Sequence, residues 1–250
     1  MKISHETPLN LLEISRFFND YDYALDIHFN DHNYFNFFKK SLELNREVIL
    51  DNSLYERRIT GIEFNENKYV QYIKTLKPTY YIIPDAYGGY EENRKLFTDW
   101  MKKFNLDLLG FRKIAVVHGR DYDDFVQCYQ FFDHLLTSND MIAFSGGDSI
   151  IRHQVIKKMF VEGIINTERK HHLLGLVYPQ EYKEYKYLKF ITSIDTSLPV
   201  TCTYENKKID EITEKPKFTI TQNFYNNKVD LSLLYYNTET FKKEINGTSS

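Results

Sequence analysis

Five short stretches of the sequence share one pattern, in which a run of β-prone residues ends abruptly at a polar or charged residue. They span residues 47–51, 80–85, 114–118, 141–145 and 190–195. Strands that are apolar along their whole length are buried on both faces, which is typical of a parallel sheet covered by helices. Ligands bind at the carboxyl ends of the strands in such folds. The pattern therefore predicts that five polar side chains surround one ligand site: Asp51, Asp85, His118, Ser145 and Asp195.

Helical patterns separate these strands along most of the chain. Helices are expected at 8–20, 33–45, 65–77, 90–104, 121–136, 149–163 and 179–187, and further strands at 23–29, 171–176 and 199–204. This alternation is typical of a (β/α)8 TIM-type barrel or of a doubly wound open sheet. The length of 250 residues and the number of strands favour the barrel. The chain also lacks the Gly-x-Gly-x-x-Gly and Walker-type loops of a nucleotide-binding open sheet.

The character of the sequence changes after residue 204. Residues 207–227 are polar and rich in Lys, Thr and Asn, with an expected hairpin around 218–220, and residues 230–244 have a helical pattern. We therefore expect residues 1–204 to form the catalytic barrel. Residues 205–250 are expected to form a short C-terminal extension packed on or near the barrel.

Composition narrows the possible partners. The formal net charge of −3 gives no global basic field, so any contact with nucleic acid requires a local basic patch. The two cysteines, Cys128 and Cys202, lack metal-type spacing, and we expect reduced thiols and no metal or cofactor. The sequence shows neither a signal peptide nor an apolar run of membrane-spanning length, which predicts a cytoplasmic protein (in the host cytoplasm if it is viral) that does not bind a membrane. Nothing in the sequence predicts an oligomeric state.

The strand-end aspartates suit chemistry at the anomeric carbon of a sugar. One carboxylate attacks or stabilises the carbon, while another exchanges a proton with the leaving group. A third can accept hydrogen bonds from the adjacent N–H donors of a guanine edge. The alternative for Asp51, Asp85 and Asp195 is a turn or N-cap role without catalysis, because turns favour aspartate whatever the function.

Two further strand ends have features of a binding site. His118 is expected to donate a hydrogen bond to a carbonyl oxygen, and Gly119 lets the backbone turn close to a ligand. The loop of Ser145, Gly146 and Gly147 lies between a strand and a helix, so its N–H groups are expected to cradle a carbonyl or a phosphate unless it is a plain turn.

One local basic pair lies on the same side as the strand ends. Arg57 and Arg58 follow Asp51 closely, and we expect them to contact a nucleic-acid backbone. Other basic pairs in the chain are interpreted as solvated helix faces.

Taken in order, these motifs resemble the tRNA-guanine transglycosylase superfamily, including its phage members that insert 7-deazaguanine derivatives into DNA. The similarity covers about residues 20–200. It lies in six segments. Residues 50–56 are similar to the family's Asp-Ser-Gly-Gly-Phe-Gln, residues 84–85 lie where the family has its base-recognising aspartate, and residues 116–119 resemble its Val-Gln/His-Gly. Residues 145–147 match its Ser-Gly-Gly, residues 172–175 resemble its Leu-Met-Gly, and residues 194–199 resemble its Phe-Asp-Cys-x-x-Pro.

The resemblance implies a role for each residue of these motifs. Asp195 is expected to be the nucleophile and Asp51 the proton-transfer group. The residues expected to bind the base are Asp85, His118, Gly119, Ser145, Gly146, Gly147, Leu174 and Gly175.

The departures from the family concern its tRNA-specific parts. The chain has no Cys-x-Cys-x-x-Cys…His zinc subdomain, Pro199 is followed by Val200 and Thr201 in place of Thr-Arg, and Asn52 and Ser53 stand in place of Gly-Gly. We therefore expect a pentosyltransferase that exchanges guanine for a 7-deazaguanine base in nucleic acid, in DNA rather than tRNA, with the target base flipped out of the stack. Two alternatives remain open: an N-glycosidase of the same fold acting on nucleosides or nucleic acid, and a non-catalytic barrel that serves as a binding module.

Overall fold

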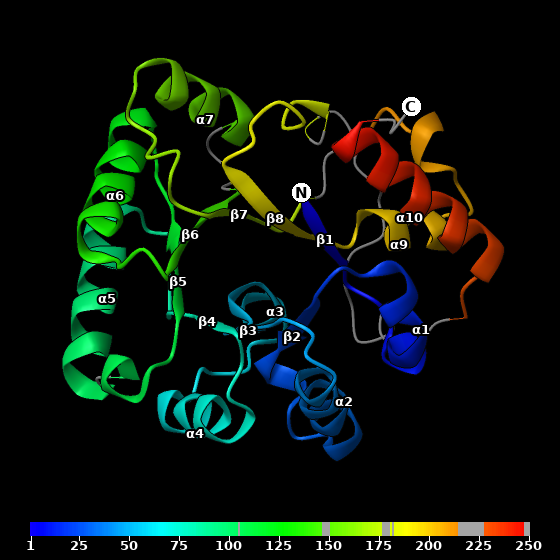
Figure 1. Ribbon diagram of the computed structural model, residues 1–250, viewed down its shortest axis with the longest axis horizontal. Coiled ribbons are helices and arrows are strands. Elements are labelled where there is room, and N and C mark those ends of the chain that lie inside the picture. Colours follow the sequence, from blue (N-terminus) through cyan, green and yellow to red (C-terminus); the bar gives the residue numbers. More distant parts are fainter. Residues whose placement is uncertain (105, 147–150, 177–180, 182, 215–227, 248–250) are drawn as a thin grey trace. The chain divides into compact units, whose positions relative to one another are not determined.

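Eight parallel strands alternate with helices in the protein, which confirms the predicted (β/α)8 TIM-type barrel (Figure 1). The structure is a computed structural model, and it describes residues 1–104, 106–146, 151–176, 181, 183–214 and 228–247. The strands follow the order β1-β8-β7-β6-β5-β4-β3-β2 in one sheet. The chain folds as two compact units, one made of residues 22–172 and the other of residues 1–21 and 173–250.

The unit of residues 22–172 contains the consecutive strands that the sequence predicted. They are β2 (Asp22–Leu25), β3 (Val48–Asp51), β4 (Tyr80–Ile82), β5 (Lys113–Val117) and β6 (Met141–Ser145), and β7 (His171–Leu174) begins at the end of this unit. The registers place Leu25 opposite Asp51 and Val117 opposite Phe144. Because these strands are buried on both faces, their continuous apolar runs are explained by helices on one side and the sheet interior on the other.

Helices follow the strands of this unit, and three of them begin at polar caps. They are α2 (His32–Glu43), α3 (Leu54–Thr60), α4 (Glu66–Leu76), α5 (Tyr90–Phe104), α6 (Tyr122–Leu135) and α7 (Arg152–Val161). Side chains of Asp31, Asn65 and Asp121 accept hydrogen bonds from the first backbone N–H groups of α2, α4 and α6. Helix α7 is followed by Gly163 at φ +71°, the left-handed conformation that commonly ends a helix and that glycine adopts without strain. The short α3 was not predicted: it spans only 7 residues, and the side chain of its N-cap residue, Ser53, makes no capping hydrogen bond.

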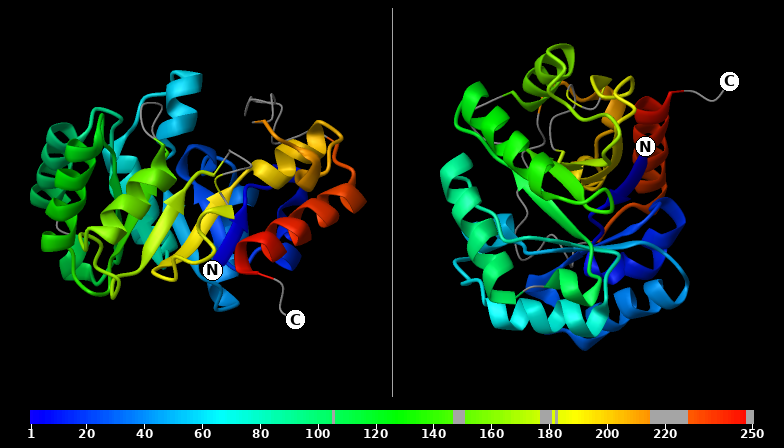
Figure 2. Two further views of the ribbon diagram at one scale, coloured as in Figure 1. Left: turned by 90° about the horizontal axis from the view of Figure 1, so that it is seen from above. Right: turned by 60° about the vertical axis from the view of Figure 1, so that its left-hand side comes forward.

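The other unit joins the two ends of the chain. It contains β1 (Lys2–His5), α1 (Leu12–Phe18), β8 (Ile191–Thr196), α9 (Leu198–Tyr204) and α10 (Leu231–Asn246). Strand β1 pairs with β8, and Ser4 lies opposite Asp195. Helix α10 packs on α9 and α1 (Figure 2), where the buried side chain of Asn237 accepts from Ile209 N–H and donates to Lys207 O.

The prediction of an eighth strand at residues 199–204 is wrong. This segment lies in helix α9, and Pro199 occupies its first turn, where a missing N–H costs no hydrogen bond. The missing strand is β1 at the other end of the sequence, a four-residue segment with one aliphatic residue, Ile3. Its pairing with β8 links positions about 190 residues apart, which no local pattern reveals. The hairpin expected around 218–220 and part of the helix expected at 179–187 lie outside the described residues.

In the part of the chain that the structure describes, none of the helices combines the length and the apolar character that crossing a membrane requires.

Candidate active site at the carboxyl ends of the strands

The centre of the candidate site is a contact between Asp85 and His118. Asp85 lies three residues after β4 and His118 directly follows β5, and their side chains are 5% and 3% exposed. Asp85 Oδ2 is 2.6 Å from His118 Nε2, and Asp85 Oδ1 accepts a hydrogen bond of 2.8 Å from Asn52 Nδ2. A carboxylate acceptor favours the tautomer with hydrogen on Nε2. Both oxygens of Asp85 therefore have fixed partners, one from the turn after β3 and one from the end of β5.

Tyr87 covers this contact from the loop between β4 and α5. Its ring packs edge-on against the His118 imidazole at 5.4 Å, and the Arg58 guanidinium lies 5.1 Å from the ring centroid. Burial, together with the charges of Asp85, Glu56 and Asp51, raises the pKa of Tyr87 above its usual range. Tyr87 therefore stays a neutral phenol beside a group of acidic side chains.

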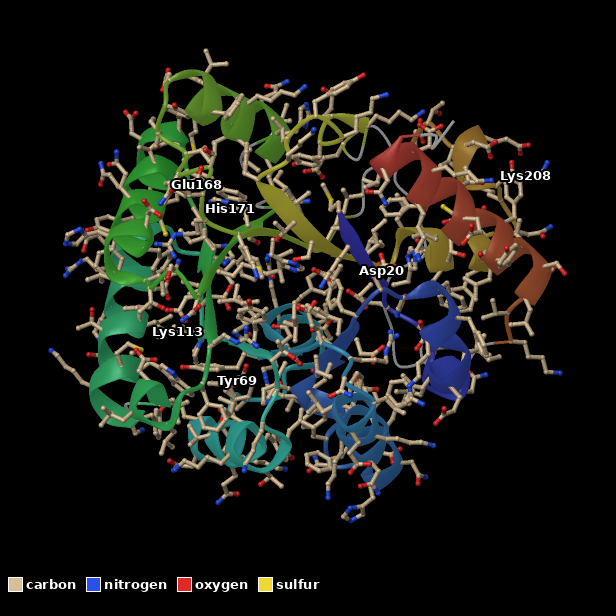
Figure 3. All side chains as sticks on the ribbon, in the orientation of Figure 1. Asp20, Tyr69, Lys113, Glu168, His171 and Lys208 are labelled. Atoms are coloured by element: carbon tan, nitrogen blue, oxygen red, sulfur yellow. The ribbon has the colours of Figure 1, made fainter. Side chains whose placement is uncertain are left out.

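Asp51 ends β3, as predicted, and is half-buried. Its charge also acts on Tyr69 of α4, labelled in Figure 3, whose hydroxyl lies within 3.0 Å of Leu50 O and 2.8 Å of Ile82 O. Burial and then the charges of Asp26 and Asp51 raise the pKa of Tyr69 well above its usual range. The carboxyl ends of β2, β3 and β4 thus place their acidic side chains in one neighbourhood of this unit.

Asp26 is an acidic residue of this neighbourhood that the sequence analysis missed. It follows β2 directly and is 5% exposed, with Oδ2 only 2.7 Å from Arg57 Nη2. Burial raises the pKa of Asp26 to about 6, although the Arg57 guanidinium opposes this shift. The signal was present in the sequence: Leu25-Asp26 ends an apolar run in the same way as Leu50-Asp51.

The two predicted nucleic-acid contacts differ in their surroundings. Arg57 points inward: besides Asp26, its guanidinium donates to Asn52 O at 3.0 Å and to Glu63 O at 2.7 Å. Arg58 is exposed and stacks over Tyr87. Arg58 is thus the member of the pair whose position suits a phosphate.

The predicted Ser-Gly-Gly loop is only partly described. Ser145 ends β6 and is buried, Gly146 is exposed, and Gly147 lies outside the described residues. A buried arginine that the sequence analysis missed lies beside it: Arg152 Nη1 donates to Phe144 O at 2.8 Å, and a Cβ on Gly146 would be 3.5 Å from the Arg152 Cζ. A basic group therefore stands at the carboxyl end of β6.

Gly119 has a packing role that the sequence did not reveal. A Cβ at this position would lie 2.6 Å from the backbone of Phe125 in α6. The glycine allows the β5–α6 connection to pass close to the helix that follows it. This contact explains the glycine without a ligand, and base binding by Gly119 stays a prediction.

In the other unit, Asp195 is held by the loop after β7. Asp195 is 2% exposed, and its Oδ1 and Oδ2 lie 3.0 and 3.1 Å from Gly175 N–H. Leu174 is the last residue of β7, and Gly175 adopts φ +60°, which a glycine accommodates without strain. The backbone of the same loop is tied to β8 by Leu176 N–H to Asp195 O at 3.2 Å and by Thr196 Oγ1 to Leu176 O at 2.6 Å. The predicted nucleophile and Gly175, a predicted base-binding residue, therefore contact each other directly.

Within the described residues, no group of three or more His, Cys, Asp and Glu side chains is arranged to hold a metal ion. Neither a comparison with protein-family models nor one with curated proteins finds a match to this chain. A functional assignment therefore depends on the chemistry of the site.

Proposed function

We propose that the protein is a base-exchange transglycosylase that replaces guanine in nucleic acid, DNA rather than tRNA, with a 7-deazaguanine derivative. The observation that supports this proposal is the series of acidic residues near the carboxyl ends of the strands. Asp51 ends β3, and Asp85 lies three residues after β4. Asp195 is the penultimate residue of β8, and His118 directly follows β5. In a (β/α)8 barrel the active site lies at the carboxyl ends of the strands.

The first displacement uses Asp195 as the nucleophile. A carboxylate oxygen of Asp195 bonds to C1′ of the guanosine, the C1′–N bond breaks, and the departing base takes up a proton from Asp51. The hydrogen bond from Gly175 N–H fixes the carboxylate before attack. The product is an ester between Asp195 and the sugar.

The second displacement restores the enzyme. The incoming base gives its ring N–H proton to Asp51, the freed nitrogen bonds to C1′, and the bond between Asp195 and C1′ breaks. Two displacements at the same carbon retain its configuration, as in retaining glycosidases.

Asp85 and His118 form the base-recognition element in this proposal. An ionised carboxylate has about four lone-pair sites, and Asp85 uses one for Asn52 and one for His118. The remaining sites suit the adjacent N–H donors of a guanine or 7-deazaguanine edge. Arg58, exposed beside Tyr87, is assigned to the phosphate backbone of the flipped nucleotide.

Mass spectrometry of nucleosides provides the test. DNA and RNA are incubated separately with the wild-type protein, labelled guanine and candidate 7-deazaguanine bases, and then digested to nucleosides. Label in DNA with the wild type, and its absence with Asp195→Ala, is the expected result. Equal labelling with Asp195→Ala contradicts the proposed nucleophile.

The same experiment separates the alternatives. Release of guanine that requires no incoming base identifies an N-glycosidase. Binding of nucleic acid with neither release nor exchange identifies a binding module.

A further inference from the structure

The ion pair of Asp26 and Arg57 is the start of a continuous chain of hydrogen bonds that reaches the base-recognition element. Arg57 joins Asp26 Oδ2 at 2.7 Å, Asn52 O at 3.0 Å and Glu63 O at 2.7 Å. One planar guanidinium thus fixes the residue after β2 relative to the turn after β3. A guanidinium can donate several hydrogen bonds in one plane and in fixed directions, which the ammonium group of lysine cannot do.

Asn52 passes this constraint on to Asp85. The Asn52 backbone carbonyl is held by Arg57, while its side-chain Nδ2 donates to Ile83 O at 3.1 Å and to Asp85 Oδ1 at 2.8 Å. His118 holds the second oxygen of Asp85. A displacement of the Asn52 backbone would therefore change the orientation of the Asp85 carboxylate.

The turn between Asn52 and α3 has a conformation that needs such support. Ser53 adopts φ +57°, in the left-handed region, where a residue with a Cβ is disfavoured. Ser53 is fully buried, and its Oγ accepts from Ile27 N–H at 3.3 Å, next to Asp26. Strained backbone of this kind persists where the surrounding structure holds it, and it is common at functional sites.

We propose that the Asp26–Arg57 pair is a positioning element that sets the orientation of Asp85, acting through Asn52. A purely stabilising role is the weaker explanation, because a buried ion pair is often no more stable than apolar residues in its place. The consequence for recognition of the base rests on the proposed function, whereas the coupling of the pair to Asp85 and His118 does not.

The unit contains a matched control for Arg57. Arg169 is a buried arginine with a similar set of partners: it pairs with Asp133 Oδ1 at 2.6 Å and donates to the carbonyls of Leu136 and Thr137. It holds the end of α6, and within the described part of the chain none of its hydrogen bonds reaches Asp85 or His118. Substitution by lysine removes the same kind of planar donor at each arginine.

The test combines NMR of protein labelled with ¹⁵N-histidine and base-exchange kinetics. Arg57→Lys and Asp26→Asn are expected to move the His118 Nε2 resonance, to raise the KM for the incoming base about 10-fold and to change kcat less than about 3-fold. These values are order-of-magnitude expectations for a charge-assisted hydrogen bond that is weakened rather than removed. Arg169→Lys is expected to leave the His118 resonance and the KM unchanged.

Two results would overturn the inference: an unchanged His118 resonance in folded Arg57→Lys and Asp26→Asn, or an equal displacement of it in Arg169→Lys. Failure of the proposed function gives a different result, since wild-type protein would then show no exchange while the His118 resonance still reports the coupling. If either variant does not fold, the other one decides the question.

Discussion

Strand β5 has one buried titratable residue at its first position and another directly after its last. Lys113 begins the strand and is 3% exposed, and His118 follows the strand and is 4% exposed. Lys113 Nζ (its residue is labelled in Figure 3) lies 2.7 Å from both oxygens of Asp107 and 3.2 Å from Asp140 Oδ2. Its charge is thus paired with two carboxylates.

The surroundings of the two residues differ although their burial is the same. Burial alone would raise the pKa of Asp140, but hydrogen bonds from Lys113 and Thr137 and the Lys113 charge lower it overall. The charged groups of this cluster are thus paired with one another. His118, in contrast, lies in the acidic neighbourhood of Asp51 and Asp85 beneath Tyr87, which is 37% exposed. In TIM-type barrels the amino ends of the strands serve stability and the carboxyl ends serve function.

The largest expected effect is a loss of activity on substitution of a residue at the carboxyl end of a strand. Asp51→Asn removes the proposed proton-transfer group and is expected to lower the rate of base exchange by about 10²- to 10⁴-fold. The free energy of unfolding should change by less than about 1 kcal/mol, because Asp51 is half-buried at a strand end. Exchange kinetics and urea denaturation measure the two effects. A large loss of stability with unchanged exchange would reverse the comparison.

The second prediction concerns the amino end. Lys113→Met leaves Asp140 buried without its cation and is expected to lower the free energy of unfolding by about 3–5 kcal/mol. The exchange rate per folded molecule should stay the same. The control is Lys103→Met, which breaks an exposed pair with Glu66 and should cost less than about 1 kcal/mol. Similar losses in the two variants would show that Lys113 is no more important than a surface lysine.

The third prediction divides binding from chemistry at the carboxyl end. Asp85→Asn keeps the size of the side chain but removes the negative charge of the carboxylate that contacts His118 and is proposed to bind the base. We expect the KM for the incoming base to rise by about 10- to 100-fold, the value of a hydrogen bond to a charged group. The kcat at saturating base should fall much less, and a loss confined to kcat would argue against a role in base recognition.

The smallest expected effect is a pH dependence of stability that arises outside the proposed site. His5 is buried between the rings of Phe18 and Phe241, and burial lowers its pKa to about 3 from 6.5. The unfolded state therefore binds more protons at this residue between these pH values. The contribution of His5 to stability is fully present above about pH 6.5 and is lost as the pH falls, by at most about 1.4 kcal/mol per pH unit.

His5→Phe should make this slope smaller. Urea denaturation between pH 4.5 and 7 compares the variant with the wild type, in which His28 acts with the same sign, since burial lowers its pKa to about 4. Asp26 acts with the opposite sign because its pKa is raised. An unchanged slope in the variant would show that the buried His5 ring does not control the acid stability.

The sequence could predict the strands and helices that have a strong local pattern. The strand at 141–145 and the helix at 90–104 have the predicted bounds, because continuous apolar runs and a 3.6-residue periodicity are local properties. It could not predict β1, whose pairing with β8 is a long-range interaction, or α3 and α9, whose short sequences have no distinctive periodicity. The same limit applied to the site. Asp51, Asp85, His118 and Asp195 were recognised as strand ends, whereas Asp26 was placed inside a longer predicted strand.

The sequence by itself determined the (β/α)8 class and the polar strand ends, because burial on both faces imposes an apolar run and the end of a strand permits a polar residue. Only the tertiary structure decided which polar groups contact one another. It placed His118 and Asn52 on the two oxygens of Asp85, Gly175 N–H on Asp195, and Arg57 on Asp26 rather than in solvent. These contacts join residues 20 to 33 positions apart, and their geometry depends on how neighbouring strand ends and loops are packed, which a linear pattern does not specify.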